Sequence, residues 1–168
     1  MDTEANPQET YRGWLDRVPE YLSGVALGAL AVLIWDGAHR LPPDRVPMHF
    51  DWSGAPDRWG GRGEFLALGL LGLLIYAGFG LGQWLVSRTA TSPAGSRRAA
   101  SPAQAVVMAG MLRWLKLETL ALVGYAAWSV VQVGTGTAAR LTPAVPLTLV
   151  VLVFATVGFF LVWLARAR

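Results

Sequence analysis

Long apolar stretches alternate with shorter polar segments along the chain, and this alternation predicts membrane-spanning helices. Four windows contain no charged residue, and they comprise residues 21–35, 65–87, 119–139 and 141–165. A helix crosses the hydrocarbon core of a bilayer with about 20 mostly apolar residues. The first window is shorter than this, but a helix that extends by one turn beyond either end reaches across. We therefore predict four spans, at about 18–36, 64–87, 104–133 and 144–165.

The composition agrees with this pattern and narrows the class of protein. Hydrophobic residues make up 54% of the 168 residues and charged residues only 15%, whereas soluble domains carry about 25% charged residues. The absence of cysteine excludes disulfides, thiolate catalysis and cysteine-based zinc sites. The net charge is +3, and no basic cluster indicates a nucleic-acid partner. The predicted fold class is all-α: an integral membrane four-helix bundle in the lipid bilayer, with residues 1–168 as one domain.

The distribution of Lys and Arg predicts which ends of the spans face the cytoplasm. With both termini inside, nine basic residues fall in cytoplasmic segments and five in outer loops, and cytoplasmic loops normally carry the excess. We therefore expect a multi-pass protein of the cell membrane with both termini in the cytoplasm. Residues 1–17 are expected to be loosely ordered, and residues 88–103 to form a cytoplasmic linker. Segment 37–63 then lies outside the cell.

Glycines predict how the first two spans pack together. Helices in lipid approach closely where small residues meet. Such residues are Gly24 and Gly28 in the first span and Gly69, Gly72, Gly78 and Gly82 in the second. We expect them to line the contact between the two spans, which would hold the ends of segment 37–63 together.

Segment 37–63 is rich in turn residues and does not continue either helix. Pro42 and Pro43 end the first helix, because proline lacks an N–H and restricts the residue before it. The stretch VPMHFDW is β-prone, and SGAPD supplies a glycine and a proline for a turn. We expect an ordered extracytoplasmic loop, either a small β-hairpin or a compact Ω-like loop.

Three kinds of chemistry are open to the polar side chains of this loop. A metal site would take His49 and Asp51, which share a face on a strand, together with His39. Acid–base catalysis would pair His49 with a carboxylate, but no catalytic motif accompanies it, so we expect no enzyme and no cofactor. In the structural interpretation, His49 donates to loop carbonyls or to an aspartate. The Asp-Arg pairs at 44–45 and 57–58 then supply turns and ion pairs that shape a surface for recognition.

Glu118 is a separate candidate because it lies within reach of a span interior. A carboxylate inside a membrane is a functional-site candidate by default. Alternatively, Glu118 is an interfacial residue beside Lys116, which we expect where the third helix crosses the inner interface.

The loop from Leu41 to Phe65, LPPDRVPMHFDWSGAPDRWGGRGEF, resembles the signature of a bacterial membrane family called domain of unknown function 1648. The family pattern is similar to L-P-x-x-[IV]-P-x-H-[FW]-[DN]-x-x-G-x-x-D-x-[WY]-G. The matching residues are Leu41, Pro42, Val46, Pro47, His49, Phe50, Asp51, Gly54, Asp57, Trp59 and Gly60.

The resemblance extends to SdpI-type immunity proteins, which protect a cell from a secreted toxic peptide and are thought to hold a transcriptional repressor at the membrane. It implies an immunity-like or sensor-like role, with a peptide or protein ligand outside and a regulator in the cytoplasm. We find no counterpart of the SdpI-type C-terminal membrane module, so we expect a short form of the family. The alternative is a metal-binding or transport-associated membrane protein that uses the His/Asp cluster of the loop and Glu118.

Overall fold

The computed structural model describes residues 7–90 and 102–166, and their side chains over 17–88 and 103–166. Its elements are helices α1 (Pro7–Arg40), α2 (Arg62–Ala90), α3 (Pro102–Gly134) and α4 (Ala144–Arg166), and strands β1 (Val46–Phe50) and β2 (Pro56–Gly60). The chain is mostly helical with a small hairpin between α1 and α2, as the sequence predicted. Most of the predicted linker 88–103 lies outside the described residues.

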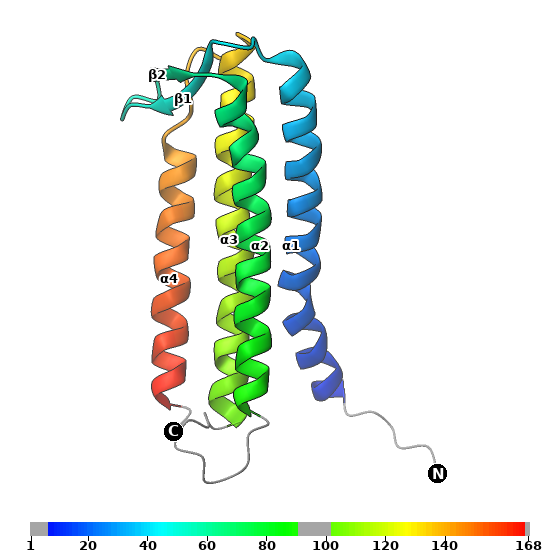
Figure 1. The fold of residues 1–168 in the computed structure, drawn as a ribbon. Coiled ribbons are helices and arrows are strands. Elements are labelled where there is room, and N and C mark those ends of the chain that lie inside the picture. Colours follow the sequence, from blue (N-terminus) through cyan, green and yellow to red (C-terminus); the bar gives the residue numbers. More distant parts are fainter. Residues whose placement is uncertain (1–6, 91–101, 167–168) are drawn as a thin grey trace.

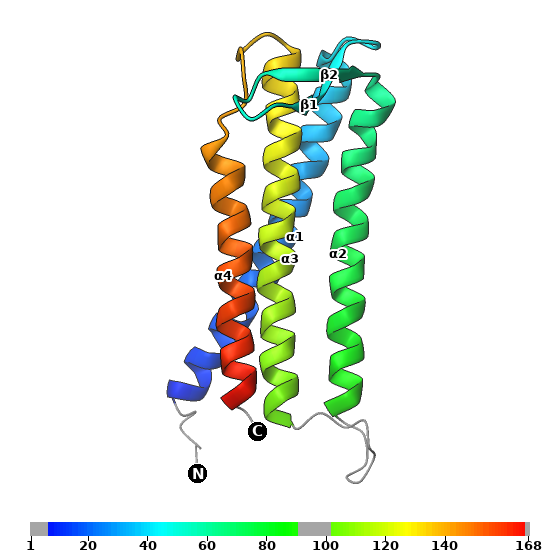
Figure 2. The ribbon, with the colours of Figure 1, turned by 90° about the vertical axis from the view of Figure 1, so that its left-hand side faces the viewer.

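The four helices run side by side and alternate in direction, with α3 in the central position (Figures 1 and 2). Helix α3 contacts each of the other three helices, whereas α4 packs chiefly against α3. With 33 residues, α3 is about 50 Å long. The hairpin and the α3–α4 connection lie together at one end of the bundle, and the beginning of α1 lies at the other end (Figure 1).

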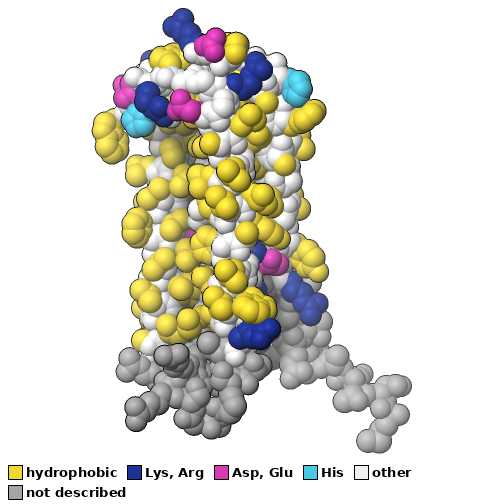
Figure 3. Space-filling model, viewed as in Figure 1, with side chains coloured by type: hydrophobic (Ala, Val, Ile, Leu, Met, Phe, Trp, Pro, Cys, Tyr) yellow, Lys and Arg dark blue, Asp and Glu magenta, His cyan; other side chains and the backbone are white. Residues whose placement is uncertain are grey.

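Three of the described helices are long and apolar enough to cross a membrane, and they comprise Arg17–Arg40 of α1, Arg62–Arg88 of α2 and Ala144–Arg166 of α4. Large apolar side chains cover the sides of the bundle, and charged side chains gather mainly toward its ends (Figure 3). This surface is typical of helices that face lipid. Helix α3 is not among the three; it holds the central position and carries Arg113, Lys116 and Glu118. The fourth span and the cytoplasmic placement of both termini stay predictions.

Helix α1 is longer than the predicted first span because it begins within the polar N-terminal segment. Its first residue is Pro7, and proline suits the first helical turn because its missing N–H would find no partner there. The expectation of loose order is therefore wrong for residues 7–17, where Gln, Glu, Arg and Leu are good helix formers. Pro19 lies inside the helix, and α1 bends near this end (Figure 1).

Only some of the glycines expected between α1 and α2 lie there. Gly69 and Gly72 face α1, where a Cβ on Gly72 would lie 2.2 Å from the Leu30 side chain. The prediction is wrong for Gly24, Gly28 and Gly78, since a Cβ added to them would meet no atom within 4 Å.

Lys116 of α3 contacts both α1 and α2. Its side chain is fully buried, and its ammonium bonds to Oε1 of Glu20 in α1 at 2.5 Å. The same ammonium lies 4.5 Å from the ring centroid of Tyr76 in α2. In this half of the bundle α3 therefore lies between the other two helices, and Gly82 of α2 faces Leu112 of α3 instead of α1. Lys116, expected at the inner interface, is enclosed by protein.

The apolar core lies directly beneath the hairpin. Its most deeply buried members are at most 1% exposed, and they are Leu41, Val46, Phe65, Ala127 and Val131. Gly37 of α1 allows this close approach, because an added Cβ would lie 2.6 Å from the Phe65 ring and 2.7 Å from Val131. Burial of these side chains joins α1, α2, α3 and β1 at one level and gives the hairpin a rigid base.

Candidate functional site

We call residues 41–61, which connect α1 to α2, the head. The head begins at Leu41, whose N–H donates to the carbonyl of Gly37 at 2.8 Å and closes the last turn of α1. The guanidinium of Arg62 donates to the carbonyl of Leu41 at 2.5 Å, and the N–H of Arg62 donates to the carbonyl of Pro43 at 2.9 Å. Both ends of the head are thus tied together at the start of α2.

The two strands of the head form an irregular antiparallel pair. Val46 pairs with Gly60 and Phe50 with Pro56, with register shifts on either side of His49. Both strands of a two-stranded sheet are edge strands. Proline is tolerated on them where the backbone N–H would face outward and would not pair with a neighbouring strand. Val46 and Pro47 are buried against the helices, while β2 is mostly exposed. The hairpin therefore shows one face to the bundle and one to the surroundings.

Asp51 organises the turn between the strands. Its Oδ1 accepts hydrogen bonds from the hydroxyl of Ser53 at 2.7 Å, the N–H of Ser53 at 2.8 Å and the N–H of Ala55 at 3.0 Å. These bonds favour the ionised carboxylate and hold the pKa of Asp51 below the ordinary value of an aspartate, with the Ser53 hydroxyl as the largest cause. Asp51 thus acts as a turn-forming residue and faces its own backbone.

The turn is also fixed to the connection between α3 and α4. Gly54 has φ +81°, and the N–H of Leu141 donates to its carbonyl at 2.8 Å. A Cβ on Gly54 would lie 2.0 Å from the carbonyl oxygen of Leu141. Only glycine fits both the left-handed backbone and this close approach.

His49 and Asp57 form a polar pair across the hairpin. Nδ1 of His49 lies 2.6 Å from Oδ1 of Asp57, and both side chains are largely exposed. Arg58 pairs with Glu64 at 2.9 Å rather than with its neighbour Asp57. Arg45 lies over the ring of Trp59, 5.0 Å from its centroid. Polar contacts on the outer face therefore join β1, β2 and the first turn of α2.

The three candidate metal ligands are engaged separately. Nδ1 of His39 lies 2.7 Å from the carbonyl of Trp35 in the last turns of α1. His49 contacts Asp57, and Asp51 is occupied by the turn. Among the side chains that the structure describes (17–88 and 103–166), no group of three or more His, Asp or Glu residues is placed to hold a metal ion. Metal binding by this set stays a prediction.

A pocket of about 270 Å³ lies beneath β1. Met48, His49 and Phe50 form its roof, and Leu122, Tyr125 and Ala126 of α3 contribute to its floor. At the edge of the pocket, the hydroxyl of Tyr125 donates to the carbonyl of Thr142 at 3.1 Å, so this hydroxyl already has a hydrogen-bond partner. The walls are mostly apolar, and the pocket can accept an apolar group that passes under the hairpin.

Two tryptophans dominate the outer surface of the head. Trp52, in the turn, is 99% exposed, and Trp59 on β2 is 41% exposed. Because Trp52 removes almost no apolar area from water, it contributes little to folding. Sequence reasoning identified the polar residues of the head but not the pocket. Its α3 residues and Leu141 are distant in sequence, and no local motif marks them.

Glu118 lies away from the head, at the middle of α3. Its side chain is buried, and the hydroxyl of Thr156 in α4 donates to its Oε1 at 2.6 Å. The ammonium of Lys116 points to Glu20 instead. Glu118 therefore joins α3 to α4 and is not part of the head.

Comparison with known proteins concerns the part of the chain that contains the head. Residues 24–75 match the family described as Domain of unknown function (DUF1648). No curated protein and no solved structure matches the chain. The matched segment includes the second half of α1, the whole head and the first half of α2. The resemblance noted in the loop sequence is thus supported over residues 24–75, and the segment that carries the head is similar to a domain whose description assigns no function.

Proposed function

We propose that this chain is a non-enzymatic bacterial membrane protein whose head recognises a peptide or protein outside the cell, in an immunity-like or sensor-like role. The observation that carries the proposal is the combination of a fixed hairpin, a fully exposed Trp52 and an apolar pocket beneath β1. Exposed aromatic side chains on a rigid support are typical of recognition surfaces. The resemblance to SdpI-type immunity proteins suggests a secreted toxic peptide as the ligand.

The rigidity of the head supports recognition rather than catalysis. Asp51 has its carboxylate committed to the turn, and His49 contacts Asp57 on the surface. A ligand would place an apolar side chain in the pocket and contact Trp52 at the tip. Because the hairpin is already ordered, binding would cost little conformational entropy.

A deletion strain provides the test of this proposal. The strain is challenged with a panel of envelope-active peptides and complemented with the wild-type gene, Trp52→Ala or Ala126→Phe. Trp52→Ala removes an exposed side chain and leaves the fold intact, and Ala126→Phe fills the pocket from α3. The matched control is Thr148→Val on the exposed face of α4.

The proposal expects that deletion raises sensitivity to at least one peptide. Wild type and Thr148→Val should restore protection, while Trp52→Ala and Ala126→Phe should not, at equal amounts of protein in the membrane. If deletion leaves sensitivity to the whole panel unchanged, or if both head variants protect as well as wild type, recognition by the head is wrong.

A further inference from the structure

Glu118 and Thr156 form a buried polar pair at the middle of the bundle. Glu118 lies halfway along α3 (Pro102–Gly134), about 24 Å from either end. It is 5% exposed, and its Oε1 accepts the 2.6 Å hydrogen bond from Thr156. Its Oε2 is buried and has no hydrogen-bond partner among the residues that the structure describes.

None of the ion pairs among the described residues neutralises Glu118. Lys116 is two residues away and so lies on the opposite side of the helix, where Glu20 and the Tyr76 ring engage its ammonium. A lone carboxylate in apolar surroundings is costly, and carboxylates inside membranes normally have a partner. The pair is therefore complementary to a ligand that brings a positive charge and an N–H donor.

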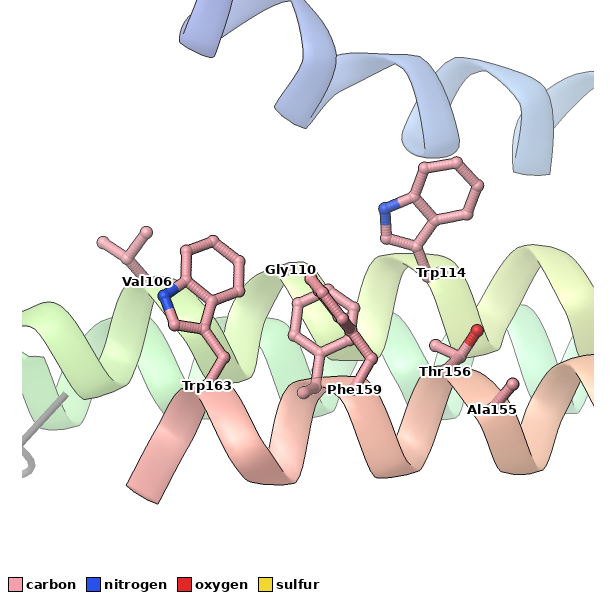
Figure 4. Close-up of a pocket in the computed structure, with 8 residues that line it drawn as sticks. Val106, Gly110, Trp114, Ala155, Thr156, Phe159 and Trp163 are labelled. Carbon is pink, nitrogen blue, oxygen red and sulfur yellow. The ribbon is translucent and has the colours of Figure 1, made fainter. Parts of the chain in front are cut away.

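A groove of about 480 Å³ between α3 and α4 is lined by Thr156, and Glu118 lies directly behind it, bonded to the Thr156 hydroxyl but not itself in the lining. Thr156 and Trp114 lie toward one end of it, and Val106 and Trp163 lie at the other (Figure 4). The described lining residues include no charged side chain. The volume falls within the range of about 300–1,000 Å³ that small-molecule sites occupy, and the faces of tryptophan rings attract cations.

We propose that this groove binds a lipophilic primary amine as its ammonium, paired with the carboxylate of Glu118. The apolar body of the amine would lie among the aromatic side chains. Its N–H groups would approach the pair at Thr156, whose hydroxyl oxygen retains lone pairs that accept hydrogen bonds. The ammonium and the carboxylate together carry no net charge, so the complex leaves no unpaired charge at the middle of the bundle. The groove is separate from the head, and this inference does not depend on the proposed function.

Two probes with the same apolar body test the proposal: 4-(4-bromophenyl)butylamine and the corresponding alcohol. The protein is held in phosphatidylcholine nanodiscs, and bromine quenching of tryptophan fluorescence reports occupancy next to Trp114 and Trp163. We expect saturable quenching with a Kd at least tenfold lower for the amine than for the alcohol. Glu118→Gln should abolish this preference, and Thr156→Val should weaken amine binding several-fold. Thr148→Val, a control on the same helix, should leave it unchanged.

The comparison of the two probes uses the unaltered protein, so it does not depend on whether a variant folds. Equal affinity for amine and alcohol would overturn the proposal, as would an amine preference that persists in folded Glu118→Gln. Quenching that rises without saturation for both probes reports only partition into the bilayer, and it would overturn the proposal as well.

Discussion

The substitution Gly54→Ala tests whether the hairpin is held in place by the connection between α3 and α4. Gly54 has φ +81°, and an added Cβ would lie 2.0 Å from the carbonyl oxygen and 3.0 Å from the carbonyl carbon of Leu141. Both neighbours are backbone atoms that cannot move aside as a flexible side chain does. The alanine must therefore separate the turn from the connection.

The size of the effect follows from two contributions. A residue other than glycine in the left-handed region costs about 1–2 kcal/mol. Loss of the hydrogen bond from the N–H of Leu141 to the carbonyl of Gly54 costs about 0.5–1.5 kcal/mol more. The control is Gly136→Ala in the same connection, where φ is +75° but a Cβ would meet no atom within 4 Å. The control bears the backbone cost alone and keeps the contact with the hairpin.

Amide hydrogen exchange of the protein in nanodiscs measures the difference. We expect exchange in residues 137–142 to accelerate at least tenfold in Gly54→Ala, since each factor of ten corresponds to about 1.4 kcal/mol. Gly136→Ala should accelerate exchange locally while leaving the turn at residues 51–55 protected. If residues 51–55 and 137–142 exchange equally fast in the two variants, the idea that Gly54 fixes the head to the bundle is refuted.

Three further predictions concern the pair of Lys116 with Glu20, the carboxylate of Asp51 and the packing beneath the head. Lys116→Met should lower the free energy of unfolding in detergent by about 2 kcal/mol. This is less than the cost of breaking a fully buried pair, because the Glu20 side chain is 40% exposed. Adding Glu20→Leu should recover most of the loss, and a double variant as unstable as Lys116→Met alone would argue against the pair. Because the pKa of Asp51 is lowered in the folded protein, its contribution to hairpin order is present above the ordinary pKa of an aspartate and is lost as the pH falls through the lowered pKa. Exchange at the turn should show this dependence in wild type, and its persistence in Asp51→Asn would assign it to another group. Gly37→Ala should lower the melting temperature, because its Cβ would meet Phe65 and Val131. Gly24→Ala should not lower it, because a Cβ at Gly24 would meet no atom within 4 Å. Equal melting temperatures of the two variants would contradict the packing described beneath the head.

The pattern of apolar windows predicted the helices well, because burial in lipid or protein leaves a direct mark on composition. The start of α1 was missed since residues 7–17 carry charges that are compatible with a helix but not with a span. The faces of the glycines were also missed. A small residue shows that close packing is allowed, but it does not show which neighbour takes the space, and Gly24 and Gly28 meet none.

The candidate site was predictable only where its contacts are local in sequence. The prolines and glycines of the head indicated a hairpin, and the aspartates indicated turns. The contact of Gly54 with Leu141, the pocket floor from α3 and the pair of Glu20 with Lys116 join residues far apart in the chain. Such contacts depend on how the helices are arranged, and no single residue type in this sequence predicts them.

Labelling of single cysteines tests most directly the claim that the head is displayed outside the cell. The chain has no cysteine of its own, so Trp52→Cys at the tip of the head and Ala165→Cys at the far end of α4 are clean reporters. In spheroplasts, a membrane-impermeant maleimide should label Trp52→Cys at once and Ala165→Cys only after permeabilisation. Labelling of Ala165→Cys alone in intact spheroplasts would place the head in the cytoplasm and contradict the account.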